Sequence, residues 1–366
     1  MLLTGWVVHS LGRVNSSALD HDVSGPQKFH ARAVPRIGGV GIFAGMLAGV
    51  ALLTWLSRAP LELAFVLLGC ALPTFGAGLI EDLTKRVCPS YRMLAMLISA
   101  ALAFWLLGAQ IHRSDIPGLD ALLAVGAGAF IVTLVAVAGI ANSVNIIDGF
   151  NGLASMCVII MLGAIAYVAF QVDDPQIGAL ALVGIGAVLG FFVWNFPSGL
   201  IFLGDGGAYF LGFYVAEIAI LLLVRNPQVS PLFPLLVCIY PAFETLFSIY
   251  RRRFLRAAPP SMPDGIHLHS LIYRRLLRWA VGDRSAKALI RRNSMTSPFL
   301  WALCMVSVVP AVLFWDSSAV MAFSLAIFAL GYVALYWSIV RFRSPRWLRR
   351  LATRPAPLQG SDNQGT

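Results

Sequence analysis

Ten apolar runs, each about 20 residues long, constrain this sequence more than any other feature, because a helix of that length spans the roughly 30 Å hydrocarbon core of a membrane. Only 12% of the 366 residues are charged, and the mean hydropathy is +0.79. Too little polar surface remains to cover a water-soluble particle of this size, which excludes a cytosolic enzyme, a secreted disulfide scaffold and a disordered chain. We therefore predict an all-α integral membrane protein, a polytopic bundle of about ten or eleven transmembrane helices. The runs centre on residues 37–57, 61–80, 92–110, 119–141, 153–171, 177–194, 207–224, 231–249, 297–315 and 318–340.

One domain accounts for the whole apolar part of the chain. Residues 1–354 are predicted to form a single transmembrane domain, whose longest connection is a basic cytoplasmic loop at 250–296. The polar residues 355–366 are expected to be a disordered cytoplasmic tail. Met1–Gly12 is apolar but too short for a span, which is compatible with the end of an eleventh helix whose beginning is missing. A cleaved signal peptide is the less favoured alternative, because no charged leader or small-residue cleavage site is evident.

The lysines and arginines predict the orientation of the bundle. When the connection around Lys28 is placed in the cytoplasm and the sides alternate from there, 23 of the 27 basic residues fall on the cytoplasmic side. Three fall on the other side, namely Arg58, Arg113 and Arg225. Because positive residues concentrate in cytoplasmic loops, the net charge of +10 indicates topology rather than binding to nucleic acid.

Polar residues are costly at membrane depth, so their positions carry functional information. Here they gather in predicted cytoplasmic connections, at Gly25–Gly39, Glu81–Arg92, Asn142–Asn151, Asn195–Asp205 and Asp264–His269. The connections at 142–152 and 195–206 contain carboxylates and amides but no lysine or arginine. This pattern favours ligation of a metal ion or a polar substrate.

Two acidic motifs stand out. Glu81 and Asp82 are adjacent carboxylates at the end of an apolar helix, where they repel each other and oppose the helix dipole unless a cation binds. Asn142, Asn145 and Asp148 recur every three residues, on about one helical face. The structural alternatives are a solvated helix end for the first motif and a polar, Asn-capped helix end for the second.

Glycines and histidines complete the candidate site. The sequence Gly204–Gly207 places Asp205 in a loop whose backbone N–H groups can approach a phosphate, although Gly-Asp-Gly is also common in turns. His267 and His269 have no further zinc ligands nearby in sequence, so they favour contact with a phosphate or nucleotide. Lys28 belongs to a basic cluster. Carboxylates, a divalent cation and basic side chains are what phosphoryl transfer between anionic reactants requires.

These motifs, taken in order, resemble the polyprenyl-phosphate N-acetylhexosamine-1-phosphate transferase family (glycosyltransferase family 4). That family includes bacterial undecaprenyl-phosphate GlcNAc-1-phosphate transferases and the phospho-MurNAc-pentapeptide translocase. The resemblance covers about residues 20–275, and the short histidine motif and basic loop look closer to the GlcNAc-type and O-antigen-type enzymes. It is carried by Pro26–His30 with Pro35–Gly39, Glu81–Lys85, Asn142–Gly149, Gly204–Gly207 and His267–His269.

The resemblance implies a reaction, a cofactor and a location. It implies that a sugar 1-phosphate of the N-acetylhexosamine type, with GlcNAc as the default, moves from a UDP-sugar to undecaprenyl phosphate. UMP would be released, and the product would start a surface polysaccharide such as the O-antigen of lipopolysaccharide. The implied cofactor is Mg²⁺, with Mn²⁺ as an alternative. The implied setting is the bacterial inner membrane, with the site facing the cytoplasm, and a homodimer is an open option.

The resemblance also implies roles for individual residues. Asp205 would ligate the Mg²⁺ ion. Asp82, with Glu81 beside it, would deprotonate or position the lipid phosphate or help to hold the metal, and Asp148 would position the nucleotide or metal during catalysis. The substrate-binding residues would be Lys28, Asn142, Asn145, His267 and His269.

Two alternatives remain open. Glu81 stands where the family usually has Asp, and Asn151 replaces the second Asp of an Asp-Gly-x-Asp-Gly pattern, which leaves open a catalytically impaired relative. A secondary transporter that uses Glu217 and Glu244 as coupling sites is disfavoured, because most ionisable residues lie at one membrane face and no halves of the sequence repeat. We interpret both glutamates as structural.

Overall fold

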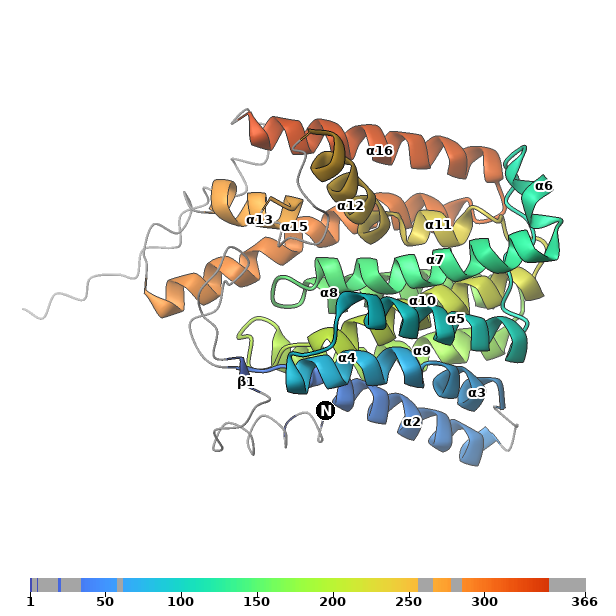
Figure 1. Cartoon of the computed structure of the whole chain (residues 1–366), viewed down its shortest axis with the longest axis horizontal. Coiled ribbons are helices and arrows are strands. Elements are labelled where there is room, and N and C mark those ends of the chain that lie inside the picture. The colour runs from blue at the N-terminus through green and yellow to red at the C-terminus, as the bar shows by residue number, and fades with distance from the viewer. Residues whose placement is uncertain are drawn as a thin grey trace, which may run out of the picture.

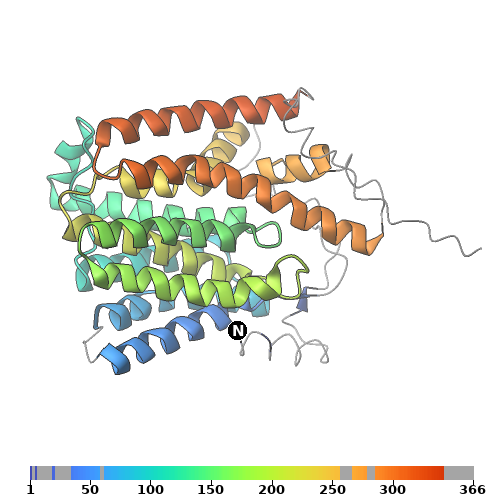
Figure 2. The same ribbon diagram turned by 180° about the vertical axis from the view of Figure 1, so that it is seen from behind.

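Long helices lying side by side form the structure, a computed structural model that describes residues 1, 5, 19–20, 34–57, 62–255, 266–277 and 285–341 (Figures 1 and 2). Within these residues the one strand pairing joins β1 (Leu19–Asp20) antiparallel to β2 (Val34–Pro35). The helices are α2 Gly38–Ser57, α3 Glu62–Cys70, α4 Leu72–Thr84, α5 Pro89–Leu106, α6 Leu119–Leu123, α7 Gly126–Ile147, α8 Leu153–Gln171, α9 Pro175–Asn195, α10 Gly204–Arg225, α11 Phe233–Val237, α12 Ile239–Tyr250, α13 Leu268–Leu271, α15 Ala286–Leu313 and α16 Ser318–Val340.

The helices confirm a polytopic membrane protein of the all-α class. In the described part of the chain, eight of them are long and apolar enough to cross a membrane. A ninth span forms if α3 and α4, which are bent by 43° at the break between them, are counted together. The eight are α2, α5, α7, α8, α9, α10, α15 and α16.

The predicted span at 231–249 is divided rather than continuous. It forms α11 and α12, which meet at Cys238. Pro241 explains the division, because proline has no backbone N–H to donate to the carbonyl of Val237 four residues earlier. Of the predicted loop at 250–296, the described parts include π-helical turns at Arg251–Leu255 and Ile272–Leu276 and the start of α15. The tail at 355–366 and most of Met1–Gly12 lie outside the described residues.

Helix α10 lies at the centre of the bundle, where 94% of its membrane-spanning window is buried. It packs against α2, α4, α7 and α8. A Cβ atom added to Gly39 of α2 would lie 2.5 Å from the backbone of Gly207, and one added to Gly78 of α4 would lie 2.5 Å from that of Gly206. Such small residues let helix backbones approach closely inside a membrane, and here they bring three helices together at the N-terminus of α10.

One end of the bundle gathers the polar connections. The α7–α8 connection and α13 lie at this end, on the left of Figure 1, whereas α6 lies at the opposite end. The segment from Phe196 to Leu203, which leads into α10, hydrogen-bonds to the chain before α2 and to the start of that helix: the N–H of Phe202 donates to the carbonyl of Pro35 at 2.8 Å, and the N–H of Gly38 donates to the carbonyl of Phe202 at 3.0 Å. Residues distant in sequence are thereby held around the N-terminus of α10.

Candidate active site

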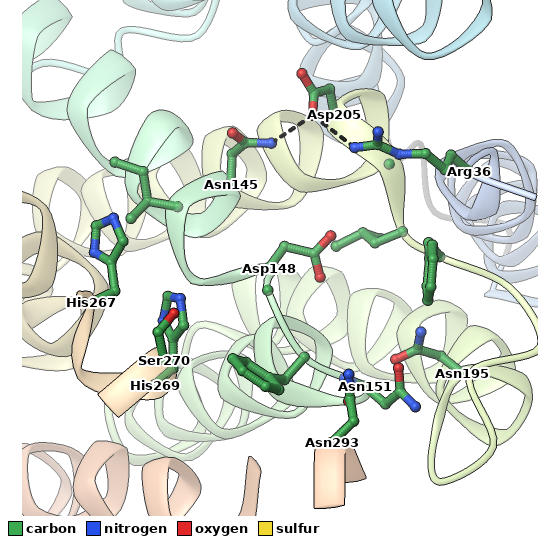
Figure 3. Close-up of a pocket in the computed structure, with 16 residues that line it drawn as sticks. Arg36, Asn145, Asp148, Asn151, Asn195, Asp205, His267, His269, Ser270 and Asn293 are labelled. Atoms are coloured by element: carbon green, nitrogen blue, oxygen red, sulfur yellow. Dashed lines mark hydrogen bonds and ion pairs between the residues drawn. The ribbon is translucent and has the colours of Figure 1, made fainter. Parts of the chain in front are cut away.

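A cavity of about 380 Å³ lies at the polar end of the bundle (Figure 3). Its walls come from the chain before α2, the end of α7, the segment before α10, the α13 region and α15. Polar side chains dominate, which is unusual for a membrane bundle and favours a polar ligand. The lining residues are Arg36, Asn145, Ile146, Asp148, Gly149, Phe150, Asn151, Asn195, Phe202, Leu203, Gly204, Asp205, His267, His269, Ser270 and Asn293.

Asp82 fixes the helix terminus that carries Asp205. Its side chain is only 2% exposed, and its two carboxylate oxygens each accept a hydrogen bond of 2.9 Å, one from the backbone N–H of Asp205 and one from that of Gly206. A carboxylate at this position satisfies the unpaired N–H groups that begin a helix. Gly204, at φ +77°, leaves room for this contact, since a Cβ there would lie 2.5 Å from Asp82 Oδ2.

Asp205 occupies the first turn of α10, and donors approach both of its oxygens. The amide of Asn145 donates to Oδ1 at 3.1 Å, and the guanidinium of Arg36 lies 3.8 Å from the same oxygen (Figure 3). Arg92, from α5, donates to Oδ2 and also to the hydroxyl of Tyr209. Asp205 therefore stands between cavity residues on one side and Arg92 on the other.

Asp148 is the least compensated carboxylate of the cavity. It follows the last residue of α7, and no described residue donates a hydrogen bond to its side chain. Burial raises the pKa of Asp148 to about 7; the nearby guanidinium of Arg36 opposes this shift, and the charges of Asp205 and Asp82 add to it. A cation beside Asp148 would remove the cost of holding an ionised carboxylate there.

The two histidines line the cavity opposite the aspartates. His267 and His269 are both buried, and their rings stack with centroids 5.1 Å apart. The Nδ1 atom of His267 is 2.9 Å from a carboxylate oxygen of Glu244. A Cβ added to Gly149 would lie 3.2 Å from His269 Nε2, so His269 borders the turn that follows Asp148.

A hydrogen-bond network holds that turn against α15. The N–H of Asn151 donates to the side-chain oxygen of Asn293 at 2.8 Å, and Ser297 donates to the carbonyl of Asn151 at 2.6 Å. The side-chain amide of Asn151 donates in turn to the carbonyl of Pro197 at 3.0 Å. The N–H of Gly152 donates to Asn195 at 2.6 Å. Asn151 thus uses its amide to connect two walls of the cavity.

Comparison with known proteins identifies the family. The sequence matches the family described as "Glycosyl transferase family 4" over residues 64–223. A Bacillus subtilis protein named "Probable undecaprenyl-phosphate N-acetylglucosaminyl 1-phosphate transferase" is 31% identical over 265 residues, which are 72% of this chain and 71% of that protein. The chain belongs to glycosyl transferase family 4. This confirms the family that the sequence motifs indicated.

Two further relatives of this family 4 chain are similar over shorter lengths. The undecaprenyl-phosphate alpha-N-acetylglucosaminyl 1-phosphate transferase of Thermotoga maritima is 27% identical over 253 residues, 69% of this chain and 72% of that protein. The phospho-N-acetylmuramoyl-pentapeptide-transferase of Bacillus thuringiensis is 31% identical over 212 residues, 54% of this chain and 64% of that protein. The family 4 match includes Asp82, Asp148 and Asp205 but ends before both histidines.

The structure of the family 4 chain brings most predicted site residues to one cavity. Asn145, Asp148, Asp205, His267 and His269 all line it. The predicted roles of these residues stay predictions, but their convergence from three separate segments supports a shared site.

The remaining predicted residues lie elsewhere. Asp82 and Glu81 do not line the cavity: Asp82 caps α10, and Glu81 accepts a hydrogen bond of 2.7 Å from the N–H of Val87. Their contacts give both a structural role, and the predicted catalytic role stays untested. Asn142 lies one turn before Asn145 on α7 and does not line the cavity. Lys28 lies outside the described residues.

Sequence reasoning missed Arg92 and Asn293 as site residues. Arg92 contributed only to the charge count for topology, although its position at the start of an apolar helix, near Glu81 and Asp82 in sequence, was a usable signal. Asn293 follows two arginines in the basic loop, and no sequence signal distinguished it.

The cavity fits a divalent cation only if a substrate supplies part of its coordination. Among the described residues, no group of three or more His, Cys, Asp or Glu side chains could hold a metal ion. Mg²⁺ commonly binds through one or two carboxylates together with waters and substrate phosphates. Asp205 and Asp148 provide two carboxylates on one cavity, and the side chain of Asp148 accepts no hydrogen bond from the described residues, with Arg36 as its one nearby cation among them. This donor set is compatible with Mg²⁺ held jointly with a phosphate ligand.

Proposed function

We propose that this protein transfers a sugar 1-phosphate from a UDP-N-acetyl sugar to undecaprenyl phosphate and releases UMP, with UDP-GlcNAc as the default donor. The names of the family 4 relatives support transfer of a phospho-sugar to a polyprenyl phosphate. We further propose that the protein lies in the bacterial inner membrane with its cavity open to the cytoplasm. There the product would begin a surface polysaccharide such as O-antigen.

One observation carries the proposal. Two carboxylates, Asp148 and Asp205, share a polar cavity with Arg36, His267 and His269 at one end of a membrane-spanning bundle. Basic side chains and a cation held by the carboxylates are what an anionic diphosphate needs when it meets a second phosphate. The cavity volume of about 380 Å³ lies within the ordinary range for small-molecule sites.

The proposed reaction exchanges one phosphorus–oxygen bond for another. An oxygen of the lipid phosphate attacks the β-phosphorus of the UDP-sugar, the bond from that phosphorus to the bridging oxygen breaks, and the oxygen leaves with UMP. A phosphate monoester has a second pKa near 6 and is largely dianionic at neutral pH. Its attack therefore needs no protein base, which agrees with the engagement of both Asp82 oxygens by α10.

The side chains of the cavity would then bind and orient the two anions. Mg²⁺, or Mn²⁺ as an alternative, held by Asp205 and Asp148, would neutralise negative charge on the diphosphate. Asn145 would orient Asp205 through their hydrogen bond. His267 and His269 would donate hydrogen bonds to the diphosphate. Arg36 would partly neutralise the negative charge of Asp205 and Asp148.

The test is release of UMP. Purified protein is incubated with undecaprenyl phosphate, Mg²⁺ and, in separate reactions, UDP-GlcNAc, UDP-GalNAc or UDP-QuiNAc, with EDTA and the Asp205→Asn variant as controls. Asp173→Asn is the matched control, because Asp173 is exposed at the opposite end of the bundle and Asn tolerates its left-handed backbone. The proposal predicts metal-dependent UMP release with one donor. EDTA-insensitive release, or no release with any donor from folded protein, would contradict it.

The contacts of Glu244 do not favour the transporter alternative, whereas neither carboxylate oxygen of Glu217 has a hydrogen-bond partner among the described residues. Glu244 binds His267 and so belongs to the cavity end of the bundle rather than to the midplane, where transporters commonly place their coupling residues. Glu217 is fully buried within α10. No specific observation favours a second function.

A further inference from the structure

The carboxylate of Glu244 is buried and lies next to His267, a residue that lines the cavity. Glu244 lies on α12 with 1% of its surface exposed. Its Oε1 atom is 2.9 Å from Nδ1 of His267 and accepts a hydrogen bond of 3.1 Å from the backbone N–H of Leu268. Its Oε2 atom accepts a hydrogen bond of 2.5 Å from the hydroxyl of Tyr332, on α16.

Three hydrogen-bond donors surround the buried carboxylate of Glu244, which indicates that the fold holds this side chain in one defined position. Burying a charged group without partners is costly, and here both oxygens are satisfied by groups from two further elements. Tyr332 is itself only 1% exposed, and it also packs edge-on against Phe243 and Phe247 of α12. The chain Tyr332–Glu244–His267 therefore connects the last described helix to the wall of the cavity.

We propose that Glu244 is a positioning residue for His267, and that Tyr332 in turn holds Glu244. This inference rests on the proposed function, because it assigns the contacts that orient a ring facing the donor diphosphate. An acceptor at Nδ1 makes the proton reside on that nitrogen. Nε2 is then the nitrogen through which His267 meets a ligand in the cavity, and it donates to a diphosphate when the ring carries a second proton on that nitrogen.

The same contacts fix the backbone of the histidine motif. His267 immediately precedes α13, and the N–H of Leu268, the first residue of that helix, is held by Glu244. The ring of His267 stacks on that of His269 with an interplanar angle of 15°. Glu244 thus orients both rings, one by a direct hydrogen bond and the other through the stack.

A double-mutant cycle tests the proposal. Glu244→Gln keeps the shape of the side chain but removes its charge, and His267→Ala removes the ring that Glu244 is proposed to orient. Loss of a group that orients a histidine commonly costs about 10-fold to 100-fold in activity. We expect Glu244→Gln to lower kcat/KM for the UDP-sugar by this factor, with KM for undecaprenyl phosphate unchanged. In the His267→Ala background the same change should cost less than about twofold, since effects that act through one residue are not additive.

The controls separate positioning from folding. Glu62→Gln, an exposed glutamate at the start of α3, should leave kcat/KM unchanged. Tyr332→Phe, which removes the hydroxyl and keeps the ring, should give a smaller loss than Glu244→Gln and also lose its effect when His267 is Ala. If Glu244→Gln does not fold, the Tyr332→Phe cycle gives the same test. Losses that multiply in the double variants would overturn the proposal, because a purely structural role predicts independent effects.

A failure of the proposed function can be distinguished from a failure of the positioning role of Glu244. If wild-type protein released no UMP, the same cycle would be measured by calorimetric binding of UDP with Mg²⁺. Non-additive losses of UDP affinity would still support the orientation of His267 by Glu244, and additive losses would still overturn it.

Discussion

Two aspartates at helix N-termini, one at each end of the bundle, make similar contacts but differ in their surroundings. Asp174 caps α9, where it accepts hydrogen bonds from the N–H of Ile177 and from the side chains of Arg225 and Asn226. Asp205 lies in the first turn of α10, where it accepts from Arg92 and Asn145. Asp174 is thus paired with one arginine and one asparagine, and Asp205 with one asparagine and two arginines, since the guanidinium of Arg36 also lies 3.8 Å from its Oδ1.

The difference lies in how many carboxylates share the cations. Burial raises the pKa of Asp174, but the hydrogen bonds from Arg225, Ile177 and Asn226 outweigh it and leave that pKa below its ordinary value. Around Asp205, by contrast, Asp82 and Asp148 lie nearby as well, and burial raises the pKa of Asp148 to about 7. A single ion pair such as that of Asp174 therefore favours a structural role. Several carboxylates around one cavity, more than the nearby cationic side chains neutralise, favour a site for a cation.

The largest difference between the two ends should appear when each aspartate is neutralised. We expect Asp205→Asn to lower UMP release by about 100-fold to 1,000-fold, the usual cost of losing one preorganised electrostatic group. Asp174→Asn should lower Tm and leave UMP release within about twofold of wild type. Equal losses of activity in the two variants would break the comparison.

Next in size is the effect of Asp82, which has no counterpart at the Asp174 end. In Asp82→Asn the new NH₂ group would face a backbone N–H of α10, so one donor there loses its acceptor. Leaving a buried donor unsatisfied costs about 1–3 kcal/mol. Thermal unfolding should show this loss, and UMP release should fall because Asp205 is displaced. An unchanged Tm combined with lost activity would instead favour a direct catalytic role for Asp82.

A smaller effect follows from the raised pKa of Asp148. Its folded pKa of about 7 exceeds the ordinary value of 3.8, so between these values the folded state binds more protons and stability falls as pH rises. The side chain at position 148 cannot ionise in Asp148→Asn, so this variant does not lose folding stability through that group as pH rises. In metal-free buffer the Tm of the variant should therefore rise relative to wild type between pH 5.5 and pH 8. Added Mg²⁺ with UDP should reduce the difference at pH 8, and a pH-independent difference would contradict the account.

The smallest effect is expected at Asn151. Asn151→Asp replaces the donor that binds the carbonyl of Pro197 with a second acceptor, which should cost about 1 kcal/mol. Activity should fall slightly along with Tm. A manyfold rise in UMP release would instead mean that Asn151 impairs this chain relative to other members of its family.

Much of the fold was predictable because the membrane imposes strong requirements on sequence. Apolar runs of the right length mark spans, but the division at Pro241 and the bend of 43° between α3 and α4 escaped that pattern. The site was predictable as a set of motifs but not as a set of contacts. Asp82 and Asp205 are 123 residues apart, and nothing local in the sequence indicates that one carboxylate caps the helix of the other. Likewise, Asn293 and Tyr332 matter only because α15 and α16 pack beside the cavity.

We propose above all that Asp205 and Asp148 hold a divalent cation together with a diphosphate. Electron paramagnetic resonance of Mn²⁺, titrated into the protein with UDP present, measures that binding directly and needs no turnover. We predict that wild type and Asp174→Asn bind about one Mn²⁺ per chain and that Asp205→Asn loses it, because Mn²⁺ takes the same oxygen ligands as Mg²⁺. Binding that is equally strong in Asp205→Asn and wild type would contradict the account.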